Sequence, residues 1–187
     1  MKSFKLLIIF LICTSLNAQV FERPAIEENI TVIITQDVKL ATMKDDHGNT
    51  PFTADIRVTA LLKGFQTHYG NLEIRLGYEY ADLQPIKYIR YSGGVGYSFN
   101  HMILPNTDYK YHLAPFVNYG VITREGNGTT LGAFEIGFDL KFPLTKHFKI
   151  VSTMQWTDRN DINKRFNTFD ALSKNFNWGV GLECLIL

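Results

Sequence analysis

The chain has 187 residues, enough for one domain with a sizeable core, and 45% of its residues are hydrophobic. Its formal net charge at pH 7 is only +1, which argues against a nucleic-acid-binding surface and gives no charge-based indication of a partner. After the first twenty or so residues no apolar block is long enough to cross a bilayer as a helix.

The first residues have the pattern of a secretory signal peptide. The basic stretch MKSFK precedes the apolar run LLIIFLICTSL at 6–16, which is too short to span a bilayer, and the small residue Ala18 follows. We predict a signal peptide over 1–18, a lead-in over 19–28 and one domain over 29–187, with a membrane anchor as the alternative for 1–18. Loss of Lys2 and Lys5 would change the formal charge from +1 to −1 (1 − 2). Cys184 would then be the one remaining cysteine, which excludes an internal disulfide and a cysteine-based metal cluster.

Apolar and polar residues alternate through most of the remaining chain, and this period of two predicts β-strands. In NLEIRLGYEY at 71–80, Leu72, Ile74 and Leu76 lie on one face, and Glu73 and Arg75 lie on the other. Eight strands are predicted, over 29–41, 52–65, 69–81, 86–100, 109–124, 129–142, 147–158 and 175–187. The first and fifth are less regular because Ile33 and Phe116 fall on the otherwise polar face. No segment has a helical period, except within 161–174.

The connectors contain turn-forming residues and, apart from the one near Pro105, alternate between long and short. The stretches 43–51 and 158–174 are long and polar, whereas 66–68 and 143–146 are short. An even number of strands places both chain ends on the same side of a barrel. The alternation therefore predicts an antiparallel barrel with short turns on one side and longer loops on the other.

Eight alternating strands fit two barrels of opposite polarity. A secreted lipocalin-like barrel buries its apolar face, and a transmembrane barrel turns that face to lipid. About five large apolar residues on each of eight strands is on the order of forty side chains, too many for the interior of an eight-stranded barrel. The polar face also carries glycines, which weaken a water-facing strand but make room inside a crowded lumen. These glycines are Gly77, Gly94, Gly96, Gly120, Gly137, Gly179 and Gly181.

Strand length and the positions of aromatic residues also favour a transmembrane barrel. Each predicted strand is long enough for the roughly 9–11 residues with which a tilted strand crosses a bilayer. Aromatic residues lie near strand ends, where interfacial girdles are expected. They include Tyr78, Tyr80, Tyr97, Phe99, Phe142, Phe148, Trp156 and Trp178. We therefore predict an all-β fold, an eight-stranded antiparallel up-and-down transmembrane β-barrel preceded by a signal peptide.

The signal peptide and strand set resemble the small outer-membrane β-barrel family, which includes the transmembrane domain of outer membrane protein A. The resemblance covers most of 29–187 and rests on the strand pattern, on Gly93–Tyr97 (GGVGY) and on Leu76–Tyr80 (LGYEY). The Ala18–Gln19 junction and the Tyr- and Asn-rich strands resemble the Bacteroidetes branch. Members of the family usually end on an aromatic residue that the barrel assembly machinery recognises, and Leu187 departs from that pattern.

The polar face then supplies charges to the lumen. Acidic and basic residues are nearly balanced, so we predict a paired network that fills and stiffens the barrel and leaves no open pore. The alternative is a path for protons, ions or small solutes. The predicted lumen charges are Asp55, Arg57, Glu73, Arg75, Glu79, Arg90, Glu135, Asp139, Lys141, Lys149 and Glu183.

No catalytic, cofactor-binding or metal-binding residues are predicted. None of the five histidines has a serine or a third ligand at usable spacing, and Gly93–Gly96 is no phosphate loop because no helix follows. The expected role is structural or surface-interacting, without enzymatic activity. The alternatives are a soluble periplasmic or secreted barrel that binds a small apolar ligand, and an outer-membrane lipid-modifying enzyme in which His112 would be the first residue to mutate.

The expected location is the outer membrane of a Gram-negative cell, with 19–28 in the periplasm. The expected partners are outer-membrane lipid, the barrel assembly machinery during biogenesis and an extracellular ligand that binds the long loops; the protein is expected to be a monomer. The longest loop mixes charge with aromatic residues and is the candidate contact surface. Its candidate residues are Arg159, Lys164, Arg165, Phe166 and Phe169.

Overall fold

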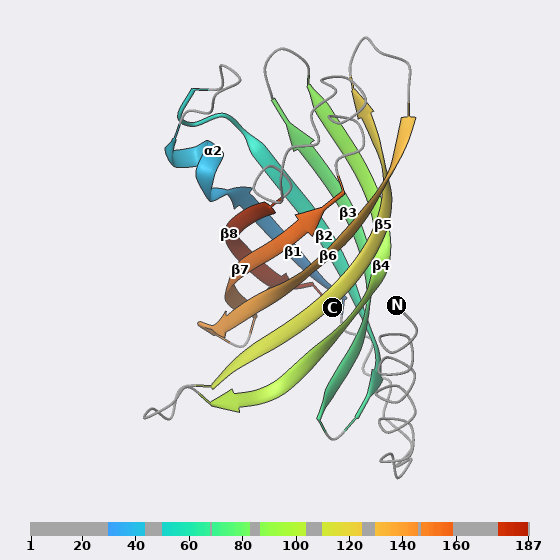
Figure 1. Cartoon of the computed structure of the whole chain (residues 1–187). Helices are drawn as coiled ribbons and strands as arrows, with labels where there is room; N and C mark the ends of the chain where they lie inside the picture. Colours follow the sequence, from blue (N-terminus) through green and yellow to red (C-terminus); the bar gives the residue numbers. More distant parts are fainter. Residues whose placement is uncertain are drawn as a thin grey trace, which may run out of the picture.

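Eight strands form one closed antiparallel barrel in the computed structural model, which describes residues 30–43, 50–67, 69–82, 87–103, 110–124, 130–145, 147–158 and 176–186 (Figure 1). Each strand pairs with its neighbours in sequence, and β1 pairs with β8 to close the sheet. The strands are β1 (Ile30–Asp37), β2 (Asp55–Gln66), β3 (Gly70–Ala81), β4 (Tyr88–Ile103), β5 (Lys110–Arg124), β6 (Thr130–Pro143), β7 (Phe148–Thr157) and β8 (Phe176–Leu185). The predicted fold class is confirmed; the predicted signal peptide and lead-in lie outside the described residues.

The two ends of the barrel differ in their connections. Strands are joined at the end that we call the loop end by 38–54, 82–87, 125–129 and 158–175. They are joined at the turn end by 67–69, 104–109 and 144–147, and β1 begins and β8 ends there. The hydroxyl of Thr67 organises one tight turn, because it accepts hydrogen bonds from the amides of Tyr69 (3.3 Å) and Gly70 (3.1 Å). Thr145 does the same at the β6–β7 turn.

The first predicted strand, 29–41, is wrong at its carboxyl end. β1 ends at Asp37, and a short helix, α2 (Val38–Thr42), follows. Asp37 caps this helix, since its Oδ1 accepts a hydrogen bond from the amide of Leu40 at 2.9 Å. One buried residue, Leu40, holds the helix to the barrel, and so short a segment gives too little periodicity to distinguish a helix from a strand. The other seven strands begin and end within three residues of the predicted bounds.

The apolar side chains of the strands face outward and the charged ones face inward. In β3, Arg75 is 3% exposed, whereas Leu76 beside it is 55% exposed. In β6, Asp139 is fully buried and its neighbour Phe138 is partly exposed. A soluble barrel would show the opposite arrangement.

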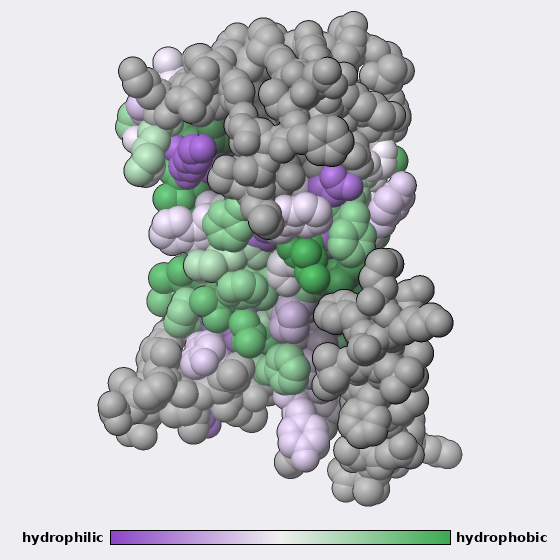
Figure 2. Space-filling view, viewed as in Figure 1, coloured by the Kyte–Doolittle hydropathy of each residue, from purple (hydrophilic) through white to green (hydrophobic). Residues whose placement is uncertain are grey.

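The outer surface is graded along the barrel. Its middle carries exposed aliphatic side chains, and Figure 2 shows hydrophobic residues gathered around the middle of the visible face. This aliphatic band includes Ile34, Ile74, Leu76, Val95, Val117, Ile136, Ile150 and Leu182. Aromatic side chains flank it, with Tyr78, Tyr91, Tyr119, Phe134, Phe176 and Trp178 toward the loop end and Phe65, Tyr69, Phe99 and Phe148 toward the turn end. An aliphatic band between two aromatic belts is the surface pattern of a barrel in a bilayer.

A polar group in the aromatic belts also finds a hydrogen-bond partner within the protein. The indole nitrogen of Trp178 donates a hydrogen bond to Ser152 Oγ at 2.9 Å, so an outward-facing hydroxyl on β7 is paired within the protein. Tyr78 and Tyr91 pack with ring centroids 5.3 Å apart across the β3–β4 pair. Cross-strand aromatic pairs of this kind stabilise neighbouring strands.

Candidate functional site

The lumen holds two networks of buried ion pairs, one toward each end of the barrel. The loop-end network joins Arg57 and Arg90 to Glu79 and Glu135. Arg90 Nη2 lies 2.6 Å from Glu79 Oε2, and Arg57 Nη1 lies 3.3 Å from Glu135 Oε1. Asn118 also donates to Glu135 at 2.9 Å. Two cations meet two anions, so the formal charge of the four residues is zero (2 − 2).

The turn-end network is larger and equally balanced. Its first part links Arg75 Nη1 to Asp139 Oδ2 at 2.9 Å and to Glu73 Oε2 at 3.4 Å. Thr153 donates a further hydrogen bond to Asp139 at 2.7 Å. A carboxylate that is ion-paired with a guanidinium and also accepts a hydrogen bond from a hydroxyl is well compensated for its burial.

Lysines complete the turn-end network. Lys141 Nζ lies 2.9 Å from Glu73 Oε1 and 3.1 Å from Glu183 Oε2, so it bridges two carboxylates. Lys149 Nζ lies 2.7 Å from Glu183 Oε1. With Arg75 and Asp139 included, three cations meet three anions and the formal sum is again zero (3 − 3). Both networks can therefore exist away from water without an unpaired ion.

An aromatic ring lies beside the guanidinium of Arg75. The guanidinium carbon is 4.0 Å from the centroid of the Phe116 ring, a distance typical of a cation–π contact. A Cβ atom built on Gly137 would lie only 2.8 Å from Phe116 Cζ and 2.8 Å from Gln155 Cβ. Glycine at 137 thus provides the space that the Phe116 ring occupies. The sequence pattern placed Phe116 on the polar face without a reason, and the contact with Arg75 supplies one.

Small apolar clusters fill the lumen beside the ion pairs. Ile33, Leu61 and Val151 form one cluster, each at most 2% exposed. Ala81, Ile122 and Ala133 form a second near the loop end. Ile33 broke the alternation of its strand in the sequence, and it is buried here because the lumen contains apolar contacts as well as ion pairs.

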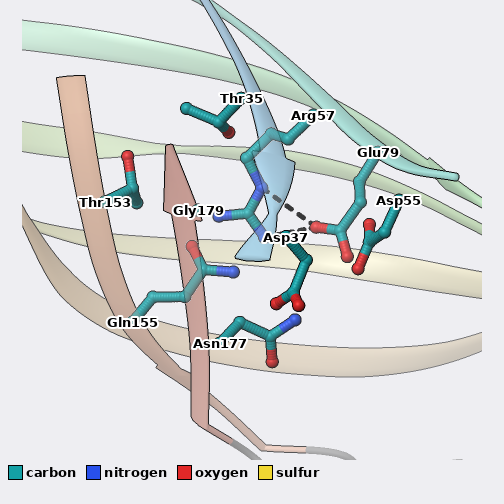
Figure 3. Close-up of a pocket in the computed structure, with 9 residues that line it drawn as sticks. All are labelled: Thr35, Asp37, Asp55, Arg57, Glu79, Thr153, Gln155, Asn177 and Gly179. Atoms are coloured by element: carbon teal, nitrogen blue, oxygen red, sulfur yellow. Dashed lines mark hydrogen bonds and ion pairs between the residues drawn. The ribbon is translucent and has the colours of Figure 1, made fainter. Parts of the chain in front are cut away.

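The structure brings together the residues predicted for the lumen. Ten of the eleven lie in the two networks, and Asp55, 6% exposed, lines the loop end of the lumen beside Glu79 (Figure 3). Sequence reasoning missed the neutral residues that hydrogen-bond to these charges. They occupy the same inward-facing alternate positions of the strands, so the period of two could have identified them. These partners are Asn118, Thr153 and Thr157. The candidate contact residues of the longest loop, from Arg159 to Phe169, lie outside the described residues.

Three further observations bear on other functions. His112 is half-buried on β5 and pairs in the ladder with Lys141. Within the described ranges, no group of three or more His, Cys, Asp and Glu side chains is arranged to hold a metal ion. No helix among these residues has the length and apolar character needed to cross a membrane.

Solved structures of membrane barrels align with most of this chain. The backbone structure of the Yersinia pestis outer membrane protein Ail in a phospholipid bilayer nanodisc aligns with 86% of this chain and 100% of its own, with a TM-score of 0.51 and 12% sequence identity. The crystal structure of Neisserial surface protein A aligns with 85% of this chain and 95% of its own (TM-score 0.42, 10% identity). A de novo designed transmembrane β-barrel aligns over the same shares (TM-score 0.39, 10% identity). No family model and no curated protein matches the sequence. The match to Ail shows that the chain has the fold of a small outer-membrane β-barrel.

Replacing Arg75 with methionine should remove the guanidinium partner of Asp139 and leave a buried carboxylate without its cation. We expect the free energy of unfolding, measured by urea titration in lipid vesicles, to fall by about 3–5 kcal/mol. The double variant Arg75→Met/Asp139→Asn should regain part of that loss, because it removes the orphaned charge. A loss below about 1 kcal/mol in the single variant, with no coupling between the two sites, would contradict the assigned pairing.

Gly137→Ala and Gly93→Ala form a matched pair within the strands. A Cβ at 137 would lie 2.5 Å from the backbone oxygen of Met154 and 2.8 Å from Phe116 and Gln155, whereas a Cβ at 93 meets nothing closer than 3.8 Å. We expect the first variant to lose about 1–3 kcal/mol of unfolding free energy through overpacking. The second should be neutral or slightly more stable. Equal stabilities in the same vesicle unfolding assay would show that Phe116 does not depend on the space at 137.

Proposed function

We propose that this protein is an outer-membrane β-barrel of a Gram-negative bacterium, with lipid against its outer face. The aliphatic band between two aromatic belts supports this location. At the outward positions of the described strands, between the belts, the side chains include no Asp, Glu, Lys or Arg. Closure of the sheet between β1 and β8 pairs the edge strands, which a hydrocarbon environment requires.

The proposed role is that of a closed scaffold with a structural or surface-interaction function and no catalytic activity. The observation that carries this proposal is the pair of charge-balanced networks that fill the lumen, with Arg90 2% and Lys141 1% exposed. An eight-stranded barrel has an interior that side chains just fill. Such a barrel gives solutes no wide path, and it holds its loops on a stiff base.

The loop end is then the outer surface, because outer-membrane barrels have short periplasmic turns and longer extracellular loops. The connection between β1 and β2 presents Phe52 there, 90% exposed, with a backbone φ of 69°. A bulky residue seldom adopts a positive φ, and strain of this kind is often found at functional loops. Phe52 and the neighbouring exposed Met43 support a contact surface for an extracellular partner. Arg159, Lys164, Arg165, Phe166 and Phe169 remain the proposed contact residues of the β7–β8 loop.

Fractionation tests the proposed location. The full chain, expressed in a Gram-negative host, should sediment with outer membranes, resist extraction by urea, and migrate differently in gels before and after boiling. The physical reason is that the closed sheet survives detergent until heat separates its strands. Recovery in the soluble periplasmic fraction would contradict the proposal and would favour the soluble carrier of a small apolar ligand.

Planar bilayer recording tests the closed lumen. Purified protein should insert without producing stable single-channel steps, because both networks and the apolar clusters obstruct the interior. Arg75→Met should also remain non-conducting, since Phe116, Lys141 and the apolar clusters still occupy the lumen. A general porin recorded under the same conditions provides the positive control. Reproducible conductance steps from the wild-type chain would show that the charges line a path instead.

A further inference from the structure

The connection between β1 and β2 holds two exposed apolar side chains on one base. Met43 follows directly after α2. The amide of Phe52 donates a hydrogen bond to the carbonyl of Ala41 at 3.2 Å, so the two legs of the connection are joined across the end of the helix. We call the described residues of this connection, 38–43 and 50–54, the β1–β2 platform.

Further contacts fix the β1–β2 platform to the barrel. Nε2 of Gln36, on β1, donates a hydrogen bond to the carbonyl of Thr53 at 3.2 Å, and its Oε1 accepts one from the amide of Asp55 at 3.2 Å. Leu40 is buried, and α2 contacts β8. The sheet therefore sets where the platform lies.

The strand register places the start of the platform at the level of the loop-end aromatic belt. Asp37 pairs with Gly179, so α2 begins where the neighbouring strand carries Trp178, a belt residue that is 44% exposed. Figure 1 shows α2 at one side of the barrel, where it continues from β1. The platform thus extends the outer surface at the height where a bilayer changes from hydrocarbon to headgroups.

The platform exposes apolar surface that nothing in the described part of the chain covers. Phe52 is 90% exposed and Met43 is 62% exposed. Phe52 also has a φ of 69°, so the turn keeps its ring in this position at a conformational cost. One isolated exposed apolar residue needs no explanation. Two on a hydrogen-bonded base, next to the aromatic belt, form a patch of the kind that marks a contact surface.

The charge of the platform fits a lipid interface. Lys39, exposed on α2, is the one ionisable side chain among its described residues. No carboxylate of these residues therefore opposes the phosphates of lipid headgroups. A lysine can keep its stem in apolar surroundings and its ammonium group among the headgroups. Asp37, which precedes α2, turns into the lumen and caps the helix (Figure 3).

We propose that the platform inserts Phe52 and Met43 into the outer-leaflet lipid beside the barrel, with Lys39 at the headgroup phosphates. Apolar side chains next to a basic residue are typical of segments that lie in a membrane interface. A soluble protein partner would not require the patch to continue the lipid-facing belt. The inference rests on the proposed function, which puts lipid against the outer face, and it names lipid as the partner of the surface that Phe52 and Met43 form.

Quenching by brominated lipid tests the insertion. The full chain with Phe52→Cys in a Cys13→Ser/Cys184→Ser background would carry a fluorophore at 52 and be folded into phosphatidylcholine vesicles. Acyl chains brominated near the headgroup should quench this label several-fold more than a label introduced by Asp82→Cys. Asp82 is the matched reference, because it is an exposed carboxylate at the same end of the barrel. A label introduced by Leu76→Cys is the positive control for the lipid-facing surface.

The three labels separate the inference from the proposed function. Strong quenching at 52 and 76, with little at 82, supports insertion. Quenching at 76 without quenching at 52 overturns the inference and leaves the proposed location intact, and so does equal quenching at 52 and 82. Absence of quenching at 76 would contradict the proposed location and, with it, the inference.

A second experiment tests the native ring of Phe52. With the label moved to 43 by Met43→Cys, Phe52→Ser should lower the ratio of inserted to exposed label about ten-fold, because burial of a phenylalanine ring favours insertion by at least that factor. Thr50→Ser, at an exposed position of the same platform, is the matched control and should leave the quenching unchanged. Equal quenching of the label in all three chains would overturn the inference.

Discussion

Every charge that the strands bury must meet a counter-ion, and the rest of this structure depends on that requirement. The outer face is apolar, so the ionic residues of the strands face the lumen, where an unpaired ion is costly. Closing the barrel solves the problem by bringing distant strands together. Arg57 reaches Glu135, 78 positions along the chain, and Lys141 reaches Glu73, 68 positions away. These pairs exist only in the closed sheet, so fold and electrostatics stabilise each other.

Side-chain volume imposes the second condition. Long charged side chains fill most of the lumen, and glycine at positions such as 137 leaves room for the Phe116 ring against Arg75. Small apolar clusters occupy what remains. A lumen packed in this way gives the loops a stiff base and suits a protein that acts at its outer surface.

Much of the fold could be predicted from the sequence, because a period of two decides which face each residue occupies. The polarity of the barrel followed from side-chain volume, because roughly forty large apolar side chains on eight strands are too many to fit inside. The period of two shows which face a residue occupies, but not its position along the barrel axis or around the barrel. The pairing of Arg57 with Glu135 could therefore not be assigned, because their strands are not neighbours. The helix α2 was missed because Asp37, a cap, resembles any other polar strand residue.

The outward orientation of the aliphatic band is the central claim, and the accessibility of a spin label at Leu76 tests it most directly. Leu76→Cys in a Cys13→Ser/Cys184→Ser background would be labelled and folded into lipid vesicles. It would then be exposed in turn to oxygen, which concentrates in hydrocarbon, and to a water-soluble nickel complex. A label at Asp82, exposed at the loop end, serves as the reference. The account predicts that oxygen relaxes the label at 76 far more than nickel does, with the reverse at 82. Equal or greater access of nickel at 76 would contradict it, because the aliphatic band would then face water.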